Sequence, residues 1–134
     1  MTYTALASRT TSSPARTRLM AILAGAVGLI HLVLVPEYLE EKPYVGWLFL
    51  AGGLMIVAAT ILGFRAAGTP RAALAWAAAA TVAAGMFVGG VASRTTGLPD
   101  GFHPQEWEPM LVVSLVLEVV YLAVWSTTVR RQLT

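Results

Sequence analysis

The sequence predicts an all-α protein: a four-helix transmembrane bundle with up-down topology and both termini in the cytoplasm. Three observations support this prediction: an excess of apolar residues, four apolar segments long enough to cross a bilayer, and arginines gathered beside alternate loops. Of the 134 residues, 57% are hydrophobic and only 12% are charged. A chain of this size has too much surface to hide that much apolar side chain from water. We therefore expect lipid, rather than water, around the bundle.

The composition also excludes several classes of function. The chain has no cysteine, which excludes disulfides, thiolate metal sites, iron–sulfur clusters and cysteine nucleophiles. Its net charge is +2, but the Lys and Arg residues are scattered and do not gather on one face, as a nucleic-acid-binding surface requires. We therefore expect no nucleic-acid partner.

Four segments can each cross a membrane as a helix: residues 19–35, 45–64, 72–92 and 110–127. A helix rises about 1.5 Å per residue, so roughly 17 to 25 apolar residues span a hydrocarbon core of about 30 Å. Backbone groups in lipid must be satisfied within their own segment, which favours helices over strands. We expect residues 18–134 to form one membrane domain. We expect residues 1–17, rich in Ser, Thr and Arg, to form a cytoplasmic tail that is disordered or lies on the membrane surface.

The first span resembles a signal peptide in one respect, because Arg9, Arg16 and Arg18 precede it. The residues that follow it read PEYL from residue 36, without the small-x-small pattern of a cleavage site. We therefore predict that the first span is an uncleaved transmembrane helix.

The cations set the orientation of the four spans. In short loops, an excess of Lys and Arg marks the cytoplasmic side of a membrane protein. With the amino terminus inside, only Lys42 and Arg94 lie outside, and the remaining cations lie inside: Arg9, Arg16, Arg18, Arg65, Arg71, Arg130 and Arg131. We expect a multi-pass protein of the plasma membrane.

Small residues in the spans predict close helix packing, because lipid provides no hydrophobic drive for helices to associate. The third span contains a GxxxG pattern at Gly85 and Gly89. Such a pattern serves packing within one chain or dimerisation, and we favour packing within the chain. Aromatic residues near the span ends predict interfacial belts: Tyr38, Tyr44, Trp47 and Trp107 outside, and Trp76 and Trp125 inside.

Glu118 is the most informative residue, because a carboxylate within a membrane is costly and usually faces a partner or a cavity. It lies eight residues after Met110, or roughly 12 Å below the outer boundary. Ser114 and Tyr121 fall on the same helix face and form a supporting polar stripe. A neutral Glu118 that shares hydrogen bonds inside the bundle is the favoured interpretation, and a role with protons or cations is the alternative.

His31 is the natural partner of Glu118. It lies roughly 6 Å below the outer boundary, and the first and fourth helices of an up-down bundle are neighbours. The pair is then an interhelical hydrogen bond, a proton relay or half of a metal site, and we favour the hydrogen bond. Haem held by two histidines is not expected, because His31 is the only histidine in a span. We predict no cofactor.

The outer loops supply the remaining candidates. Glu37, His103, Glu106 and Glu108 together offer oxygen and nitrogen ligands for a divalent cation, but their spacing matches no ligand motif, so a solvated loop is favoured. Arg94 pairs with Glu37, Glu106 or Glu108, or else it binds an anionic headgroup or substrate. The loop over residues 94–109 is long for a helix–helix connection, and loops of this kind are often functional or flexible.

Two segments carry a resemblance to known proteins. Residues 31–46 read HLVLVPEYLEEKPYVG and residues 94–118 read RTTGLPDGFHPQEWEPMLVVSLVLE. The shared pattern is a His near the end of the first helix, a Pro-Glu just outside it, a GLP-containing outer loop and an acid in the last helix. In these features the chain resembles uncharacterised small four-span membrane proteins of actinobacteria. In architecture alone it is similar to DoxX-type proteins, and this likeness implies no residue roles.

Two functions follow from these observations. The first is a non-enzymatic accessory or structural membrane component, whose partners are the lipid bilayer and either another membrane protein or a second copy of the chain. The alternative is a transport or redox-associated protein that handles protons or cations through His31 and Glu118. An enzyme is the least favoured class, because no nucleophile–base pattern is present.

Overall fold

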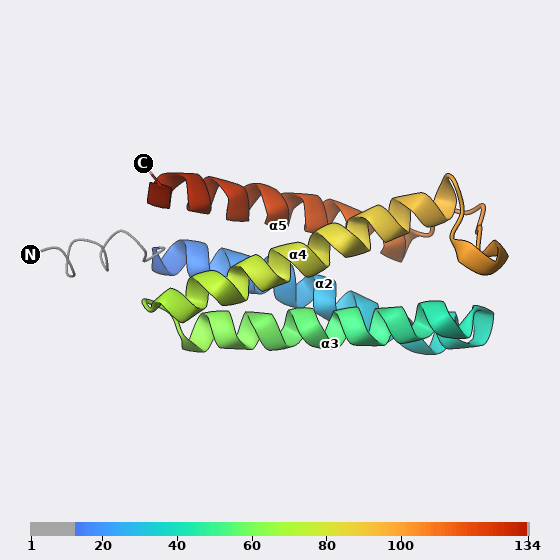
Figure 1. The fold of residues 1–134 in the computed structure, drawn as a ribbon, viewed down its shortest axis with the longest axis horizontal. Helices are drawn as coiled ribbons and strands as arrows, with labels where there is room; N and C mark the ends of the chain where they lie inside the picture. Colours follow the sequence, from blue (N-terminus) through green and yellow to red (C-terminus); the bar gives the residue numbers. More distant parts are fainter. Residues whose placement is uncertain (1–12, 134) are drawn as a thin grey trace, which may run out of the picture.

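The computed structural model describes residues 13–133, and helices account for most of them (Figure 1). The four long helices are α2 (Pro14–Glu41), α3 (Pro43–Arg65), α4 (Pro70–Arg94) and α5 (Pro109–Leu133). A short 3₁₀ helix, η1 (Pro99–Gly101), lies between α4 and α5. All four long helices have the length and composition needed to cross a membrane. The prediction of an all-α chain with four apolar helices is therefore confirmed.

Each long helix begins with a proline, and each extends beyond the apolar span predicted for it. Proline suits the first helical turn, because its missing N–H would be unpaired there in any case. The hydropathy criterion stops at polar residues, whereas the backbone hydrogen bonds continue through them. Helix α2 begins at Pro14, within the segment expected to be a tail, and the Ser13 side chain caps it by accepting the Arg16 backbone N–H at 3.3 Å. The rest of that predicted tail, residues 1–12, lies outside the described residues.

The four long helices form a closed ring in chain order. Helix α2 packs against α3 and α5, and α4 also packs against α3 and α5, while α2 and α4 face each other across the middle. The chain direction alternates from each helix to the next, so Pro14 and Leu133 lie at the same end of the bundle (Figure 1). This arrangement places the second half of α2 beside the first half of α5.

The outer surface of the bundle is apolar. Many large hydrophobic side chains point away from the helices they could pack against, among them Ile22, Val33 and Leu74, which are 68%, 68% and 74% exposed. Such a surface is unfavourable in water and favourable in lipid. The structure therefore has the surface of an integral membrane protein.

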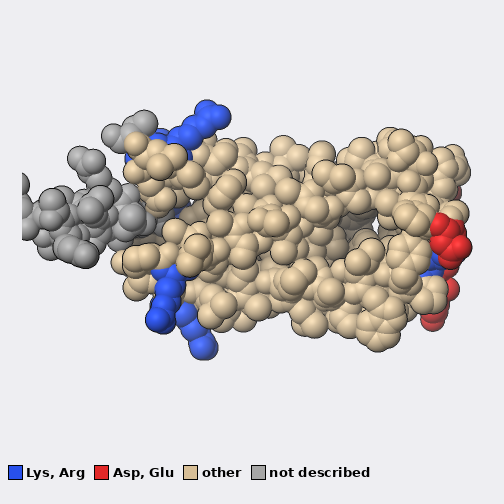
Figure 2. All heavy atoms as spheres, viewed as in Figure 1, with Lys and Arg blue, Asp and Glu red and all other residues tan. Residues whose placement is uncertain are grey.

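Charged residues on the surface lie at the two ends of the bundle. On the surface, arginines lie at the end where the described chain begins and finishes, and acidic residues gather at the opposite end (Figure 2). Lys42 and Arg94 also belong to that opposite end, whereas Glu118 is buried within the bundle. We call these the arginine end and the acidic end. Two interior clusters correspond to them: a large one near the arginine end that includes Met20, Trp76 and Tyr121, and a smaller one near the acidic end around Tyr38 and Phe102.

Glycines let α2 and α3 approach closely. A Cβ atom added to Gly28 would lie 2.6 Å from a Val57 methyl group and 3.3 Å from the Gly53 carbonyl oxygen. A Cβ atom added to Gly53 would lie 3.3 Å from the Gly28 carbonyl oxygen. These contacts agree with packing by small residues, which membrane helices use in place of a hydrophobic drive.

The predicted aromatic belts are only partly correct. Trp47 and Trp107, 61% and 48% exposed, lie on the surface near the acidic end. Tyr38 and Trp76, in contrast, are almost completely buried, and the belt prediction is wrong for both. Trp76 lies against Gly63, where an added Cβ atom would come within 2.6 Å of the indole ring. Tyr38 turns inward because its hydroxyl group accepts a hydrogen bond from Arg94.

We predict that Gly28→Ala destabilises the bundle by about 1 to 3 kcal/mol, the usual cost of overpacking, because stiff β-branched side chains face the added methyl group. Thermal unfolding of the purified protein in detergent measures this effect. Gly85→Ala is the matched control, because no atom lies within 4 Å of its added Cβ. It is expected to leave stability unchanged or to raise it slightly through helix propensity. Equal losses in both variants would contradict this packing role for Gly28.

Candidate functional site

The structure brings His31 and Glu118 together between α2 and α5. The Nε2 atom of His31 lies 3.8 Å from Oε1 of Glu118. The Ser114 hydroxyl, one turn earlier on α5, donates a hydrogen bond of 2.9 Å to the same carboxyl oxygen. His31 is 6% exposed and Glu118 is 1% exposed, so both side chains are shielded from bulk solvent.

A backbone contact fixes the tautomer of His31. Its Nδ1 atom lies 2.9 Å from the carbonyl oxygen of Val27. A carbonyl oxygen only accepts hydrogen bonds, so Nδ1 carries a proton. In the neutral ring Nε2 is then unprotonated, and its lone pair is on the side of the ring near Glu118. The pair therefore consists of a hydrogen-bond acceptor and a carboxyl group.

One carboxyl oxygen of Glu118 has no partner. Its Oε2 atom is buried and forms no hydrogen bond with any described residue. The predicted polar stripe is divided, because Ser114 contacts Glu118 while the Tyr121 hydroxyl donates to the Trp76 carbonyl oxygen at 2.7 Å. An unpaired buried polar atom costs free energy, typically about 1 to 3 kcal/mol. Glu118 thus retains an unused hydrogen-bonding position.

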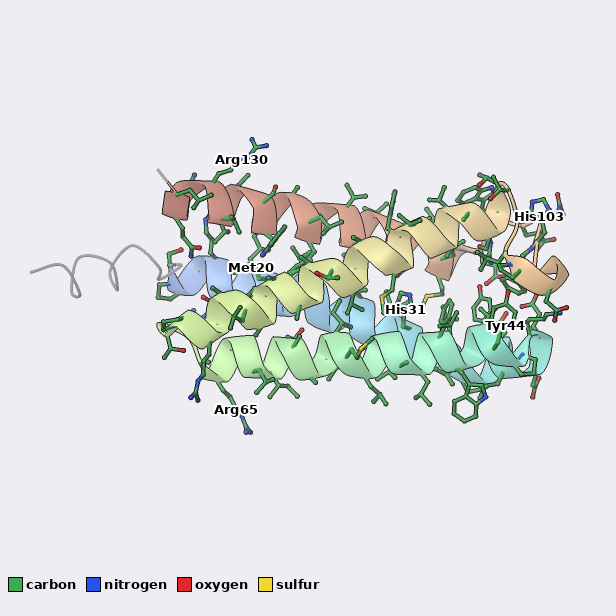
Figure 3. All side chains as sticks on the ribbon, in the orientation of Figure 1. Met20, His31, Tyr44, Arg65, His103 and Arg130 are labelled. Atoms are coloured by element: carbon green, nitrogen blue, oxygen red, sulfur yellow. The ribbon has the colours of Figure 1, made fainter. Side chains whose placement is uncertain are left out.

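A cavity of about 410 Å³ adjoins the pair. It lies mainly between α3 and α4, and the surface is hollowed there in the half nearer the acidic end (Figure 2). The His31 side chain lies in this region (Figure 3). His31 and Glu118 form part of the lining, Ser93 and Arg94 form its polar end, and the remaining walls are mostly apolar, with side chains that include Leu48, Phe49, Met55, Val82, Met86, Phe102 and Leu111.

Gly85 and Gly89 line the cavity and do not pack against another helix. No atom lies within 4 Å of a Cβ atom built on either residue. The expectation that this GxxxG pattern packs within the chain is therefore wrong. The physical reason is the separation of α3 and α4 near the acidic end, which leaves one side of α4 without a neighbouring side chain. Gly85 and Thr81 are exposed, so the cavity opens sideways through this part of the surface.

Arg94 ties together the acidic end of the bundle. Its Nη2 atom donates to the Tyr38 hydroxyl at 2.9 Å and to Oε1 of Glu108 at 3.4 Å. Its Nη1 atom donates to the Ser93 hydroxyl at 2.8 Å, and its Nε atom donates to the Glu106 backbone carbonyl at 3.3 Å. Among the partners expected from the sequence, Glu108 uses its side chain and Glu106 its backbone. The fixed fork of donors on a guanidinium suits this linking of α2, α4 and the loop that leads into α5.

Aromatic rings connect Arg94 with His31. The Tyr38 ring stacks on Phe49 with a centroid separation of 4.3 Å, and Phe49 lies 4.8 Å from the His31 ring. Phe102, from the loop before α5, meets the edge of the Tyr38 ring at 6.0 Å. The loop, the arginine network and His31 therefore belong to one packed unit.

The two outer loops hold each other. Lys42 Nζ forms an ion pair with Asp100 at 2.9 Å, and the Tyr44 hydroxyl donates to the Pro99 carbonyl oxygen. The turn at residues 99–101 is η1, and Asp100 adopts a left-handed backbone conformation with φ of 63°. The loop over residues 95–108 is thereby held across the acidic end of the bundle.

The structure does not assemble the divalent-cation site considered from the sequence. Within residues 13–133, no group of three or more His, Asp or Glu side chains is placed to hold a metal ion. Glu37, His103 and Glu106 are exposed on the surface, and Glu108 is occupied by Arg94. These side chains share one end of the bundle without converging on a point.

Sequence reasoning missed Tyr38, Phe49 and Ser93. Tyr38 lies seven residues after His31 and therefore on the same helix face, which was an available signal. Ser93 directly precedes the outer arginine. No sequence signal identifies Phe49, because its position depends on how α3 is rotated about its axis.

Comparison with models of protein families, with curated proteins and with solved structures finds no match. The chemistry of the site must therefore be argued from its own geometry.

Glu108 gives the acidic end a pH-dependent stability. Burial raises the pKa of its carboxyl group above the ordinary value of 4.5, and the nearby Glu37 raises it further, while Arg94 lowers it. The raised pKa means that the folded state prefers the protonated form. This stabilisation is present below the unfolded-state pKa and is lost as the pH rises through the folded-state pKa.

We predict that Glu108→Gln removes this dependence. The melting temperature of the variant should match that of the wild type at acidic pH, and should exceed it once the pH passes the raised pKa. Thermal unfolding between mildly acidic and neutral pH measures the difference between the two proteins. Glu40→Gln, which removes an exposed acid at the same end, is the control. A variant that loses stability at neutral pH would show that the pairing with Arg94 outweighs burial.

Proposed function

We propose that this chain is a multi-pass protein of the plasma membrane, with both termini in the cytoplasm, that binds and releases a proton at the His31–Glu118 pair. The single observation that carries the proposal is the geometry of that pair. An unprotonated His31 Nε2 lies near a carboxyl group with one unpartnered oxygen, and both residues line a cavity. Ionisable groups inside membrane proteins commonly mark proton or ion pathways.

The charge distribution supports the orientation. Six arginines of the described chain belong to the arginine end: Arg16, Arg18, Arg65, Arg71, Arg130 and Arg131. Among the described residues, the acidic end has only two cationic side chains, Lys42 and Arg94. Each forms an ion pair with an acidic residue. Lys and Arg accumulate in cytoplasmic loops, so the arginine end faces the cytoplasm. The cavity then lies in the outer half of the membrane.

The proton balance at the pair is simple. A protonated Glu118 can transfer its proton to His31 Nε2, giving a carboxylate and an imidazolium that remain together as an ion pair. At 3.8 Å the two atoms are too far apart for a direct hydrogen bond. A group within the cavity that contacts both residues can bridge them. The exchange therefore depends on what occupies the cavity.

Access to the pair is one-sided. On the cytoplasmic side of His31, fully buried apolar residues close the interior, including Ala24, Val27, Ala79 and Ala83. A much smaller cavity, about 30 Å³, lies beyond them near Trp76 and Trp125. Proton exchange from the outer side suits a redox-associated or binding role better than conduction across the membrane.

A second candidate is the non-enzymatic accessory component. The closed cytoplasmic half favours it, because a well-packed bundle with a broad apolar surface suits a partner in the membrane.

We also propose a relationship with small four-span membrane proteins of actinobacteria. The two segments that carry this resemblance contain His31, Tyr38, Arg94 and Glu118, so the resemblance includes the residues of the site.

Infrared difference spectroscopy of the protein in lipid bilayers tests the proposal. We expect a protonated-carboxyl C=O band from Glu118 whose amplitude changes with pH, and we expect it to disappear completely in Glu118→Gln. Gln keeps an acceptor for the Ser114 hydroxyl, so the variant should fold, as circular dichroism can verify. His31→Phe should shift the midpoint of the change. A Glu118 band that stays constant over the whole range in which the protein is folded would support the accessory role instead.

A further inference from the structure

We propose that the cavity binds a lipophilic molecule that carries a hydroxyl group and enters sideways from the membrane between α3 and α4. This inference rests on the proposed function, because the hydroxyl group would be the bridge between His31 and Glu118. Three features of the structure support it: the polar groups of the site, the apolar walls and the position of the opening.

The polar groups are complementary to a hydroxyl. His31 Nε2 offers a lone pair, and a protonated Glu118 offers an O–H from the carboxyl group that has an unpartnered oxygen. A hydroxyl group donates one hydrogen bond and accepts others, so it satisfies both residues at once. A carbonyl group would satisfy only Glu118. The 3.8 Å separation joins His31 Nε2 to Oε1 of Glu118, the oxygen that also accepts from Ser114. One hydroxyl oxygen can lie at a hydrogen-bonding distance of about 2.8 Å from both of these atoms.

The walls suit an apolar chain. The volume of about 410 Å³ lies within the range of roughly 300 to 1,000 Å³ that is typical of small-molecule sites. Along α3 the lining runs from Val45 to Met55, a rise of roughly 15 Å. Met55 and Met86 are unbranched and adapt to ligands of irregular shape.

The opening faces lipid and not water. Gly85 and Gly89 leave part of the α4 side of the cavity without side chains, and Gly85 is exposed on the surface of the bundle. The acidic end is covered by Leu98 and Phe102 of the loop, which the Arg94 network holds in place. A molecule dissolved in the membrane therefore has a shorter route than one dissolved in water.

Other occupants fit less well. An ordinary acyl chain would fill the space between the apolar walls but would offer no hydrogen-bond donor to His31 Nε2. A second copy of this chain, docked on Gly85 and Gly89, would cover the opening but would not reach the pair at the back of the cavity. Both occupants are outcomes that the experiment can detect.

The test measures the binding of three probes to the purified full-length protein in detergent: para-nonylphenol, its methyl ether and nonylbenzene. The three share the same ring and alkyl chain, and only the phenol has a hydroxyl group. We expect the phenol to bind about tenfold more tightly than the ether, the difference that one net hydrogen bond supplies. Native mass spectrometry or calorimetry provides the measurement.

Two variants assign the effect to the cavity. His31→Phe removes the acceptor and should bring the ratio of phenol to ether affinity close to one. Gly89→Leu fills the opening and should weaken all three probes by about tenfold or more. Ala78→Leu adds similar bulk to an exposed position of α4 that does not line the cavity, and it should bind like the wild type.

Three outcomes would overturn the inference. Equal affinities of the wild type for phenol and ether would show that only the apolar walls matter. A Gly89→Leu variant that binds normally would place the probes elsewhere. A change from dimer to monomer in that variant, without a change in probe binding, would assign the opening to a second copy. In each case a pH-dependent Glu118 band would still support the proposed function, so the two failures are distinguishable.

Discussion

The arrangement of this bundle depends on one constraint: in hydrocarbon, a polar group has to find its partner within the protein. Backbone groups meet the constraint by forming four long helices. Glu118 meets it only in part, because Ser114 satisfies one carboxyl oxygen and the other has no partner among the described residues. His31 lies across the α2–α5 interface from this carboxyl group, and the cavity adjoins both residues. The unsatisfied oxygen is the reason why this region is the candidate site.

The two halves of the bundle differ in packing for a physical reason. Near the arginine end, small and large residues interlock, as Gly63 does with Trp76, and the helices lie close together. Near the acidic end, Arg94 holds the loop and α2 together while α3 and α4 separate. A guanidinium with four partners can stabilise an end that lacks a dense apolar core, and this allows a hollow beneath it.

Much of the fold followed from the sequence, because hydropathy and length determine which segments can cross a bilayer. The meeting of His31 and Glu118 followed from the place of both residues in the outer half of their spans and from the adjacency of the first and last helices. The position of Phe49 and the open side of Gly85 and Gly89 did not, because they depend on how each helix is rotated and tilted against its neighbours. Small residues alone do not tell whether a helix face meets another helix or borders a cavity.

The central claim is that the pair and its cavity lie in the outer half of a membrane whose cytoplasmic side holds the arginine end. Labelling of single cysteines tests it most directly, because the natural chain contains none. Gln105→Cys lies in the loop at the acidic end and Ala67→Cys in the loop between α3 and α4, and both positions are exposed. A membrane-impermeant maleimide applied to intact cells should label Gln105→Cys, and should label Ala67→Cys only after permeabilisation. The reverse pattern, or equal labelling of both in a detergent-free soluble fraction, would contradict the account.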